Sequence, residues 1–432
     1  MKKVAVLLDF FAYDPAYSLC TVARNQILML LRAGYSPRVL VDDHFPDPKE
    51  KPEEAPYPWD SVELFRLPSI PRSNFVELPD DWQTHLDKMT DAMRKGLEGI
   101  EVVLTHDFIY QPSQLLYQWA GRRITEERGD TIHWCHTIHS ATSPALINTT
   151  NEYLQNIKVR FPNSKIIFPN SFSRSRVASN FGYEERDVVF VPHAVDYCEF
   201  FGFHEMTTRI VEEKNMLGAD VIMCYPLRLD DGKQPEWLVR IGAGLKALGK
   251  SVRIIYAAFH STGPEKIQVK NKVYKLARKL GLNEDEVTFT CDFDKSLEVR
   301  CPRQMVRDFM TLSNVFCLPS RSETYSLVAQ EAGLAGNLLV LNYDFGVMYS
   351  LYGADAIYAK FGANWDAMTG MDGETKITYD PSPETYGRDI AMKIVYELQH
   401  EKALAMKTKL RQTRNLDYVM KNYLEPLLYS WD

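Results

Sequence analysis

Short apolar runs alternate with longer amphipathic stretches along most of the chain. The runs are rich in valine, isoleucine and leucine, and they occupy residues 4–8, 37–41, 101–105, 131–135, 165–168, 188–191, 221–226, 252–257, 287–290, 315–318 and 338–341. Continuous apolar runs of this kind predict strands that are buried on both faces of a parallel sheet. Because stretches with helical character separate the runs, the pattern indicates right-handed βαβ units.

The length of the chain indicates two domains. A chain of 432 residues exceeds what one hydrophobic core supports, so we expect two α/β domains of similar size. The boundary is predicted in the region 197–218, between the turn VPHAVD and the strand that begins at Val221. Pro383 begins a helical end of the chain whose last residues are apolar and aromatic, and such an end must pack on another part of the protein.

Composition narrows the class of protein. Hydrophobic residues make up 45% and charged residues 25% of the chain, as in ordinary soluble globular proteins, and the net charge of −7 gives no general attraction to nucleic acid or anionic lipid. Seven scattered cysteines without CxxC or Cys/His metal spacing indicate reduced thiols and a cytoplasmic protein. No apolar run approaches the length of a membrane span, and Asp9 interrupts the first run too early for a signal peptide.

Two acids stand in the segment PSRSETYSLVAQEAGLAG. Glu323 lies in the loop after the apolar run SNVFCLP, and Glu331 lies in a helix expected to begin near Tyr325. The order strand, loop, helix places both carboxylates at the carboxyl edge of a parallel sheet, where ligands bind. The amides of Tyr325, Ser326 and Leu327 would form an anion site, so the segment suits a ligand with phosphates and hydroxyls, such as a sugar nucleotide. The alternative is that Glu323 is an ordinary acid near a helix start and that Glu331 is a solvated surface residue.

A pair of cations follows the run VIMCYP. Arg228 and Lys233 are five positions apart in LRLDDGKQPEW and can clamp a diphosphate, because arginine offers a planar fork and lysine a point charge. Together with helix amides they could replace a divalent metal in stabilising the negative charge on a leaving nucleoside diphosphate. The alternative is that Asp230 and Asp231 simply pair with these cations at the surface.

Histidines mark the ends of two predicted strands. TIHWCHTIHSATSP contains His133, His136 and His139, whose spacing on an extended chain does not converge on one metal ion. His136, at the predicted strand end, is the candidate to touch a sugar hydroxyl or the reacting centre. The alternative for His133 and His139 is that their rings are buried and hydrogen-bonded within the fold. His106 and Asp107 follow EVVLT in the same way and are candidates for the acceptor side.

Four motifs in order resemble the retaining glycosyltransferases of family 4, which have the GT-B fold. SNVFCLPSRSETYSLVAQEAGLAG is similar to the acid-x7-acid signature of that family, and LRLDDGK to its Arg-x4-Lys loop. PNSFSRSRVASNFG followed by VVFVPHAVD resembles its Asn-Ser helix and Pro-x-x-Val-Asp turn, and WCHTIHS its histidine loop. The likeness covers residues 101–342. It implies two Rossmann-like, doubly wound parallel-sheet domains facing a cleft: an acceptor domain (1–200), a nucleotide-sugar domain (201–405) and a C-terminal helix (406–432) that crosses back to the first domain.

The resemblance also implies roles for individual residues. Catalysis would rest on His136, Glu323, Arg228 and Lys233. The donor would be bound by Arg228, Lys233, Asp292, Phe293, Glu323, Thr324, Tyr325, Ser326, Leu327 and Glu331, with Asp292 and Phe293 beside the base, Glu331 on the ribose and Glu323 on the sugar. The acceptor side would comprise Tyr17, Ser18, His106, Asp107 and His139.

The implied reaction is transfer of a hexose-type sugar from a UDP- or GDP-sugar to a hydroxyl group, with retention of configuration and with neither a cofactor nor a catalytic metal. The acceptor could be a glycan, a small molecule or a modified DNA base. The sequence departs from the family in the loop DPAYSLC, which lacks a Gly-Gly pair, and at Cys291 and Ser326, where glycine is common. Three alternatives stay open: a viral-type enzyme acting on a hydroxymethylated DNA base, a non-catalytic sugar-nucleotide binding protein, and a nucleotide-sugar epimerase.

Overall fold

Two compact units make up the protein. The computed structural model describes residues 1–8, 17–47, 58–70, 78, 80–109, 111, 114–141, 159–257, 264–321, 323, 325–344, 346–363 and 377–431. The first unit comprises Met1–Asp196 and Arg414–Asp432, and the second comprises Tyr197–Thr413. From the sequence, the corresponding divisions were predicted after residues 200 and 405.

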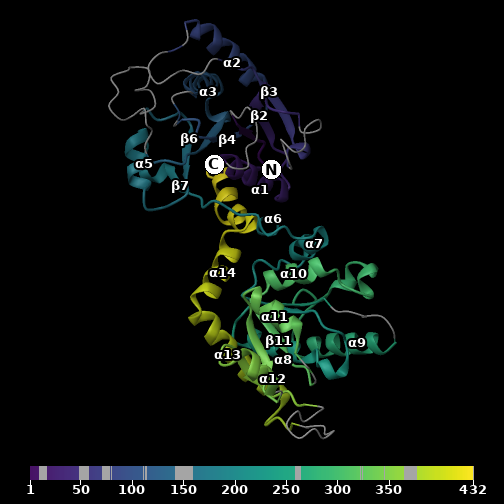
Figure 1. Ribbon diagram of the computed structural model, residues 1–432. Helices are drawn as coiled ribbons and strands as arrows, with labels where there is room; N and C mark the ends of the chain where they lie inside the picture. Colours follow the sequence, from purple (N-terminus) through teal and green to yellow (C-terminus); the bar gives the residue numbers. More distant parts are fainter. Residues whose placement is uncertain are drawn as a thin grey trace. The chain divides into compact units, whose positions relative to one another are not determined.

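The first unit contains a seven-stranded, fully parallel sheet (Figure 1). Its strands are β1 (Val4–Leu7), β2 (Arg38–Asp42), β3 (Glu63–Leu67), β4 (Val102–His106), β5 (His133–Thr137), β6 (Ser164–Phe168) and β7 (Val188–Phe190), in the spatial order β3-β2-β1-β4-β5-β6-β7. The main helices are α1 (Ser18–Arg32), α2 (Trp82–Gly96), α3 (Leu115–Arg128) and α5 (Arg174–Phe181). The strand order reverses between β1 and β4, as in doubly wound folds.

Both faces of this sheet are buried, because successive strand residues point to opposite sides. Ala5 and Leu7 belong to a core shared with α2, α3 and α5, whereas Val4 and Val6 belong to a core shared with α1. The second core also contains the end of the chain, α15 (Leu416–Val419), a π-helical turn (Met420–Leu424) and α16 (Glu425–Leu428). The C-terminal segment therefore packs on the first unit (Figure 1).

The second unit repeats the arrangement with six parallel strands. They are β8 (Val221–Tyr225), β9 (Val252–Tyr256), β10 (Val287–Phe289), β11 (Val315–Leu318), β12 (Leu338–Asn342) and β13 (Ile357–Ala359), in the order β10-β9-β8-β11-β12-β13. The helices are α6 (Tyr197–Phe200), α7 (Glu205–Glu213), α8 (Glu236–Ala247), α9 (Pro264–Lys279), α10 (Arg303–Leu312), α11 (Leu327–Leu334), α12 (Gly346–Tyr352), α13 (Pro383–His400) and α14 (Lys402–Thr413).

The predicted fold class is confirmed: two Rossmann-like, doubly wound domains with a C-terminal segment that returns to the first, which is the domain composition of the GT-B fold. Two edge strands, β3 and β13, had no counterpart among the predicted apolar runs. All seven cysteines are buried thiols that form no disulfide with one another. Within the described residues, every helix is too short or too polar to cross a bilayer.

Candidate functional site

The second unit has its switch in strand order between β8 and β11, which pair with each other. The loops that leave neighbouring strands at such a switch run to opposite sides and open a crevice at the carboxyl edge of the sheet. The loop after β8 carries Arg228 and Lys233, and the loop after β11 carries Glu323. A backbone hydrogen bond of 2.8 Å from the Arg321 amide to the Gly232 carbonyl joins the two loops.

Lys233 and Glu323 meet at this edge of the sheet. The Lys233 ammonium lies 2.5 Å from Glu323 Oε1 and 3.2 Å from Ser320 Oγ. The lysine and glutamate side chains are 19% and 15% exposed, so the pair is largely screened from water but not sealed off. The structure thus brings together two of the four predicted catalytic residues and adds Ser320, which was not predicted from the sequence.

Buried polar side chains hold the two loops in place. The Tyr225 hydroxyl lies 3.3 Å from the Arg228 carbonyl oxygen and 3.2 Å from that of Lys233. Burial raises the pKa of Tyr225 well above its ordinary value, so the hydroxyl stays protonated. Gln234, 3% exposed and at φ 49°, donates from Nε2 to the carbonyls of Pro319 (2.6 Å) and Phe361 (2.9 Å). Neither Tyr225 nor Gln234 carried a sequence signal that could have revealed this supporting role.

Arg228 is the more exposed of the two cations. Its side chain is 60% exposed, and Nε lies 3.2 Å from Asp230 Oδ2. Asp230 also pairs with Lys266. For Arg228 the structure therefore shows the aspartate pairing that the sequence left open as an alternative, whereas Lys233 pairs with Glu323.

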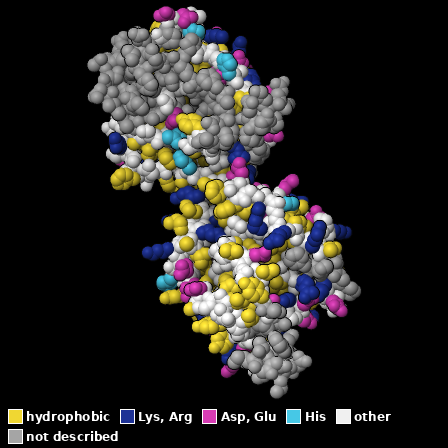
Figure 2. All heavy atoms as spheres, in the orientation of Figure 1, with side chains coloured by type: hydrophobic (Ala, Val, Ile, Leu, Met, Phe, Trp, Pro, Cys, Tyr) yellow, Lys and Arg dark blue, Asp and Glu magenta, His cyan; other side chains and the backbone are white. Residues whose placement is uncertain are grey.

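The helix after Glu323 begins later than predicted. Helix α11 starts at Leu327 rather than near Tyr325, and Ser326 precedes it with φ 63° and ψ 80°. Among the described residues no side chain caps this end, and the first amides of a helix lack intrahelical acceptors. Leu327 and Leu334 are 67% and 90% exposed, and Figure 2 shows hydrophobic side chains gathered over α11. Thr324 lies outside the described residues.

Glu331 is engaged with a neighbouring helix. Its Oε1 lies 3.0 Å from an Nη atom of Arg303 at the start of α10. The arginine side chain is 92% exposed, so this ion pair sits at the surface and contributes little to stability. A role of Glu331 on the ribose stays a prediction.

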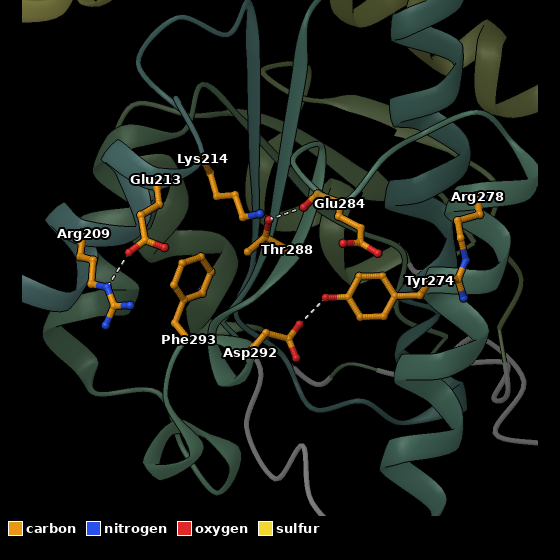
Figure 3. Close-up of a pocket in the computed structure, with 9 residues that line it drawn as sticks. All are labelled: Arg209, Glu213, Lys214, Tyr274, Arg278, Glu284, Thr288, Asp292 and Phe293. Carbon is orange, nitrogen blue, oxygen red and sulfur yellow. Dashed lines mark hydrogen bonds and ion pairs between the residues drawn. The ribbon is translucent and has the colours of Figure 1, made fainter.

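Asp292 and Phe293 follow β10 at the edge of the sheet. The Asp292 carboxylate accepts hydrogen bonds from Lys270 and from the Tyr274 hydroxyl. Both Asp292 and Phe293 line a cavity of about 440 Å³ that is bordered by α7 and α9 (Figure 3). Their predicted contact with a nucleotide base is untested.

In the first unit, a histidine–aspartate group stands at the carboxyl edge of the sheet. Asp107, at φ 50°, accepts a hydrogen bond of 3.2 Å from the His139 amide, and its Oδ1 lies 3.2 Å from His139 Nδ1. The His139 side chain is 23% exposed and stacks on His193 at 5.2 Å. Burial and the neighbouring imidazoles lower the pKa of His106 to about 3 and that of His193 to about 4, so both rings are neutral near pH 7.

His136 does not lie at a strand end, and this corrects the expectation that it faces a ligand. Strand β5 runs to Thr137, two residues beyond the predicted end at 135, so His136 lies inside the strand. The side chain is 0% exposed, Nδ1 lies 2.8 Å from Thr105 Oγ1, and the rings of Phe108 and Phe161 flank it at 5.7 and 4.8 Å. Burial lowers its pKa well below the ordinary value.

The remaining predicted residues lie at the start of α1. Tyr17 is the residue before the helix and is 47% exposed, and Ser18 is its first, exposed residue. The rest of the DPAYSLC loop on the N-terminal side of Tyr17 lies outside the described residues. Among the described residues, no group of three or more histidine, cysteine, aspartate and glutamate side chains is arranged to hold a metal ion.

No protein-family profile matches the sequence, and no curated protein does. Among solved structures, the chain is similar to HepE of Anabaena in complex with UDP-glucose (13% identity, 99% of each chain, TM-score 0.36). It is also similar to a glycosyltransferase of Rickettsia africae (13% identity, 99% of each chain, TM-score 0.34) and to sucrose-phosphate synthase of Thermosynechococcus elongatus (15% identity, 99% of this chain and 98% of that chain, TM-score 0.32). At these TM-scores the likeness supports no conclusion about activity.

Proposed function

We propose that the protein is a glycosyltransferase that moves a hexose-type sugar from a nucleoside-diphosphate sugar to a hydroxyl acceptor. One observation carries the proposal: where the strand order switches, Lys233 from the loop after β8 meets Ser320 and Glu323 from the loop that leads to the start of α11. A cation and the free amides at a helix start each suit a phosphate, and a carboxylate suits sugar hydroxyls.

The leaving group is the centre of the proposed mechanism. When the bond between the sugar C1 and the diphosphate oxygen breaks, negative charge grows on the diphosphate. The Lys233 ammonium and the first amides of α11 are fixed by the fold before the reaction, so they stabilise this charge without reorganising. The exposed Arg228 guanidinium, released from Asp230, adds a two-pronged contact to the phosphate oxygens.

Glu323 would hold the transferred sugar. Its carboxylate is oriented by the Lys233 ammonium at 2.5 Å and accepts hydrogen bonds from sugar hydroxyls through its remaining lone pairs. In the first unit, His139, predicted on the acceptor side, also takes the catalytic role predicted for His136, because it is partly exposed and Asp107 fixes its ring. The acceptor oxygen forms the new bond to C1, and the departing diphosphate oxygen takes up its proton.

We also propose that the reaction retains the anomeric configuration of the donor and requires no metal ion. The acceptor would attack from the side on which the diphosphate leaves, so no second carboxylate nucleophile of the glycosidase type is needed. The fixed cations and amides would stand in for a divalent ion on the diphosphate. Activity should therefore persist after dialysis against EDTA, and the product should have the same anomeric configuration as the donor by NMR.

The proposal is tested with a panel of UDP-, GDP-, ADP- and TDP-sugars. At least one donor should raise the melting temperature and release nucleoside diphosphate, because a ligand that binds only the folded state stabilises it. Stabilisation by a donor without any release of diphosphate, across a broad set of acceptors, would indicate a binding protein. Absence of both effects with every donor would overturn the proposal.

A further inference from the structure

The cavity of about 440 Å³ beside β10 is a second candidate site, separate from the Lys233–Glu323 pair. Strand β10 is the outermost strand of the second sheet, and the cavity is lined from α7, from α9, from the segment before β10 and from the loop after it (Figure 3). Its volume lies in the range of small-molecule sites.

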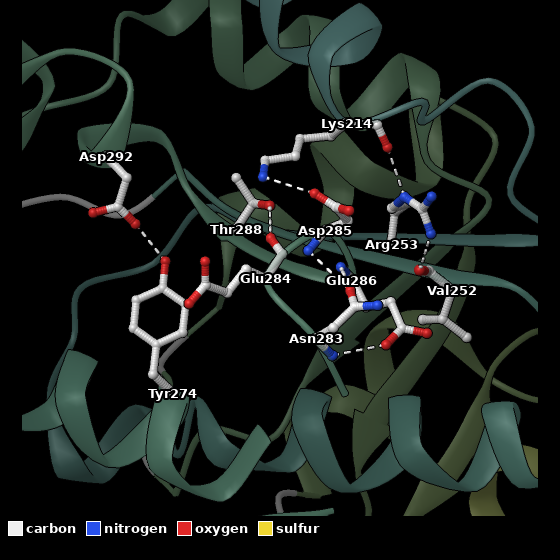
Figure 4. Close-up of polar contacts among 10 residues, drawn as sticks. All are labelled: Lys214, Val252, Arg253, Tyr274, Asn283, Glu284, Asp285, Glu286, Thr288 and Asp292. Atoms are coloured by element: carbon white, nitrogen blue, oxygen red, sulfur yellow. Dashed lines mark hydrogen bonds and ion pairs between the residues drawn. The ribbon is translucent and has the colours of Figure 1, made fainter. Parts of the chain in front are cut away.

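Most charged groups on its wall already have partners. Arg209 Nε lies 2.6 Å from Glu213 Oε1 within α7, and Lys214 Nζ lies 3.0 Å from Asp285 Oδ1 (Figure 4). The Asp292 carboxylate is held by Lys270 and Tyr274. These pairs fix the shape of the wall and leave little unsatisfied charge on it.

Two opposite charges at the rim differ from the others. The side chains of Arg278 and Glu284 make no hydrogen bond or ion pair with any described residue, and both are exposed. They flank the ring of Tyr274, Arg278 one turn along α9 and Glu284 in the segment before β10 (Figure 3). A guanidinium and a carboxylate on either side of an aromatic ring therefore face the cavity ready to bind a ligand.

The balance of charge indicates what kind of ligand fits. Three cationic and three anionic side chains line the cavity, so its formal charge is zero and neither anions nor cations are attracted overall. Sugar hydroxyls both donate and accept hydrogen bonds, so a carboxylate and a guanidinium can bind the same sugar. The Phe293 ring, half-buried on the wall, offers an apolar surface to the C–H face of a sugar ring.

We propose that this cavity binds a neutral carbohydrate of one or two sugar rings, with Arg278 and Glu284 as its hydrogen-bonding partners and Phe293 as its stacking surface. This goes beyond the proposed transferase reaction, because binding here requires no nucleotide. The inference assigns Phe293 to a sugar ring in place of the nucleotide base predicted from the sequence.

The test measures sugar binding to the full chain without nucleotide. Methyl glycosides of glucose, galactose and mannose, with maltose and lactose, are titrated and followed by saturation-transfer NMR and calorimetry. At least one sugar should bind, and Arg278→Ala and Glu284→Ala should each weaken it by about tenfold, the effect of one lost charged hydrogen-bonding partner. Lys272→Ala, an exposed lysine on α9 outside the cavity lining, should bind as the wild type does.

Several outcomes would overturn the inference: no sugar binds, both rim variants bind like wild type, or free uridine displaces the sugar, which would make the cavity part of a nucleotide site. Hydrogen–deuterium exchange of the wild-type protein gives a readout that does not depend on the folding of variants. Saturating sugar should protect residues 284–293, and unchanged exchange there would contradict the proposal. Diphosphate release should be unchanged in the rim variants, so failure of the transferase proposal and failure of this one are distinguishable.

Discussion

Replacing Lys233 with alanine removes the ammonium that the loops after β8 and β11 share. The ammonium lies 2.5 Å from Glu323 Oε1 and 3.2 Å from Ser320 Oγ, with both charged side chains less than one fifth exposed. Its loss leaves the Glu323 carboxylate partly buried without this partner, which should cost about 1–3 kcal/mol of folding stability. If the ammonium also stabilises the leaving diphosphate, kcat should fall about 10²–10³-fold, as when one such donor is removed from an enzyme.

A matched control separates the two effects. Lys246 on α8 makes a similar pair with Glu286, at 2.8 Å, in the same unit but outside the proposed site. Lys246→Ala should lower the melting temperature while leaving diphosphate release unchanged. The double variant Lys233→Ala/Glu323→Ala should regain part of the stability, because no unpaired carboxylate remains, and should stay inactive.

The assay combines steady-state diphosphate release with thermal melting followed by circular dichroism. The expected pattern is a small loss of stability together with a large loss of kcat in Lys233→Ala. A kcat within about threefold of wild type, whatever the change in melting temperature, would refute the assignment of Lys233 to the leaving group.

The other predictions concern the second cation and the histidines. Arg228→Lys keeps the charge but loses the planar fork, so KM for the donor should rise about tenfold, and Arg228→Ala should raise it further; equal values for both would contradict a two-pronged contact. His139→Ala should lower kcat with little change in melting temperature. His136→Ala should lower the melting temperature of the protein, because the side chain is fully buried. The reverse pattern would support the original prediction that His136 contacts the ligand. The folded-state pKa values of His106 and His193, about 3 and 4, lie below the ordinary 6.5. Keeping these rings neutral therefore stabilises the folded state fully above about pH 6.5, and this stabilisation is lost as pH falls toward 4. The free energy of unfolding should fall by up to about 1.4 kcal/mol per pH unit for the buried His106 and by less for the partly exposed His193. Urea midpoints should be lower at pH 5 than at pH 7, and His106→Asn should reduce the difference; equal midpoints in the wild type would contradict the depressed pKa values.

The two sheets could be predicted because their central strands are continuous apolar runs. VIMCY in β8 and VFCL in β11 are buried at every position, which is the pattern of a strand covered on both faces. The edge strands gave no such signal. Strand β3 (ELFRL) contains Glu63 and Arg66 and is only partly buried, and β13 has three residues, so neither stood out from the surrounding loops.

The family resemblance assigned Lys233 and Glu323 to the same donor, and the structure brings them into contact because each follows one of two neighbouring strands. Nothing in the sequence showed that these two strands pair. The error at His136 came from the strand end. His133–Thr137 reads HWCHT, in which polar and apolar residues mix, and nothing in those letters shows that Phe108 and Phe161 enclose the imidazole. Burial of polar residues depends on partners distant in sequence, so it could not be predicted locally.

The central claim is most directly tested by an experimental structure of the protein with a nucleoside diphosphate. We expect a β-phosphate oxygen within about 2.7–3.2 Å of Lys233 Nζ and of an amide at the start of α11. A diphosphate bound away from both groups, with Lys233 still paired to Glu323, would contradict it.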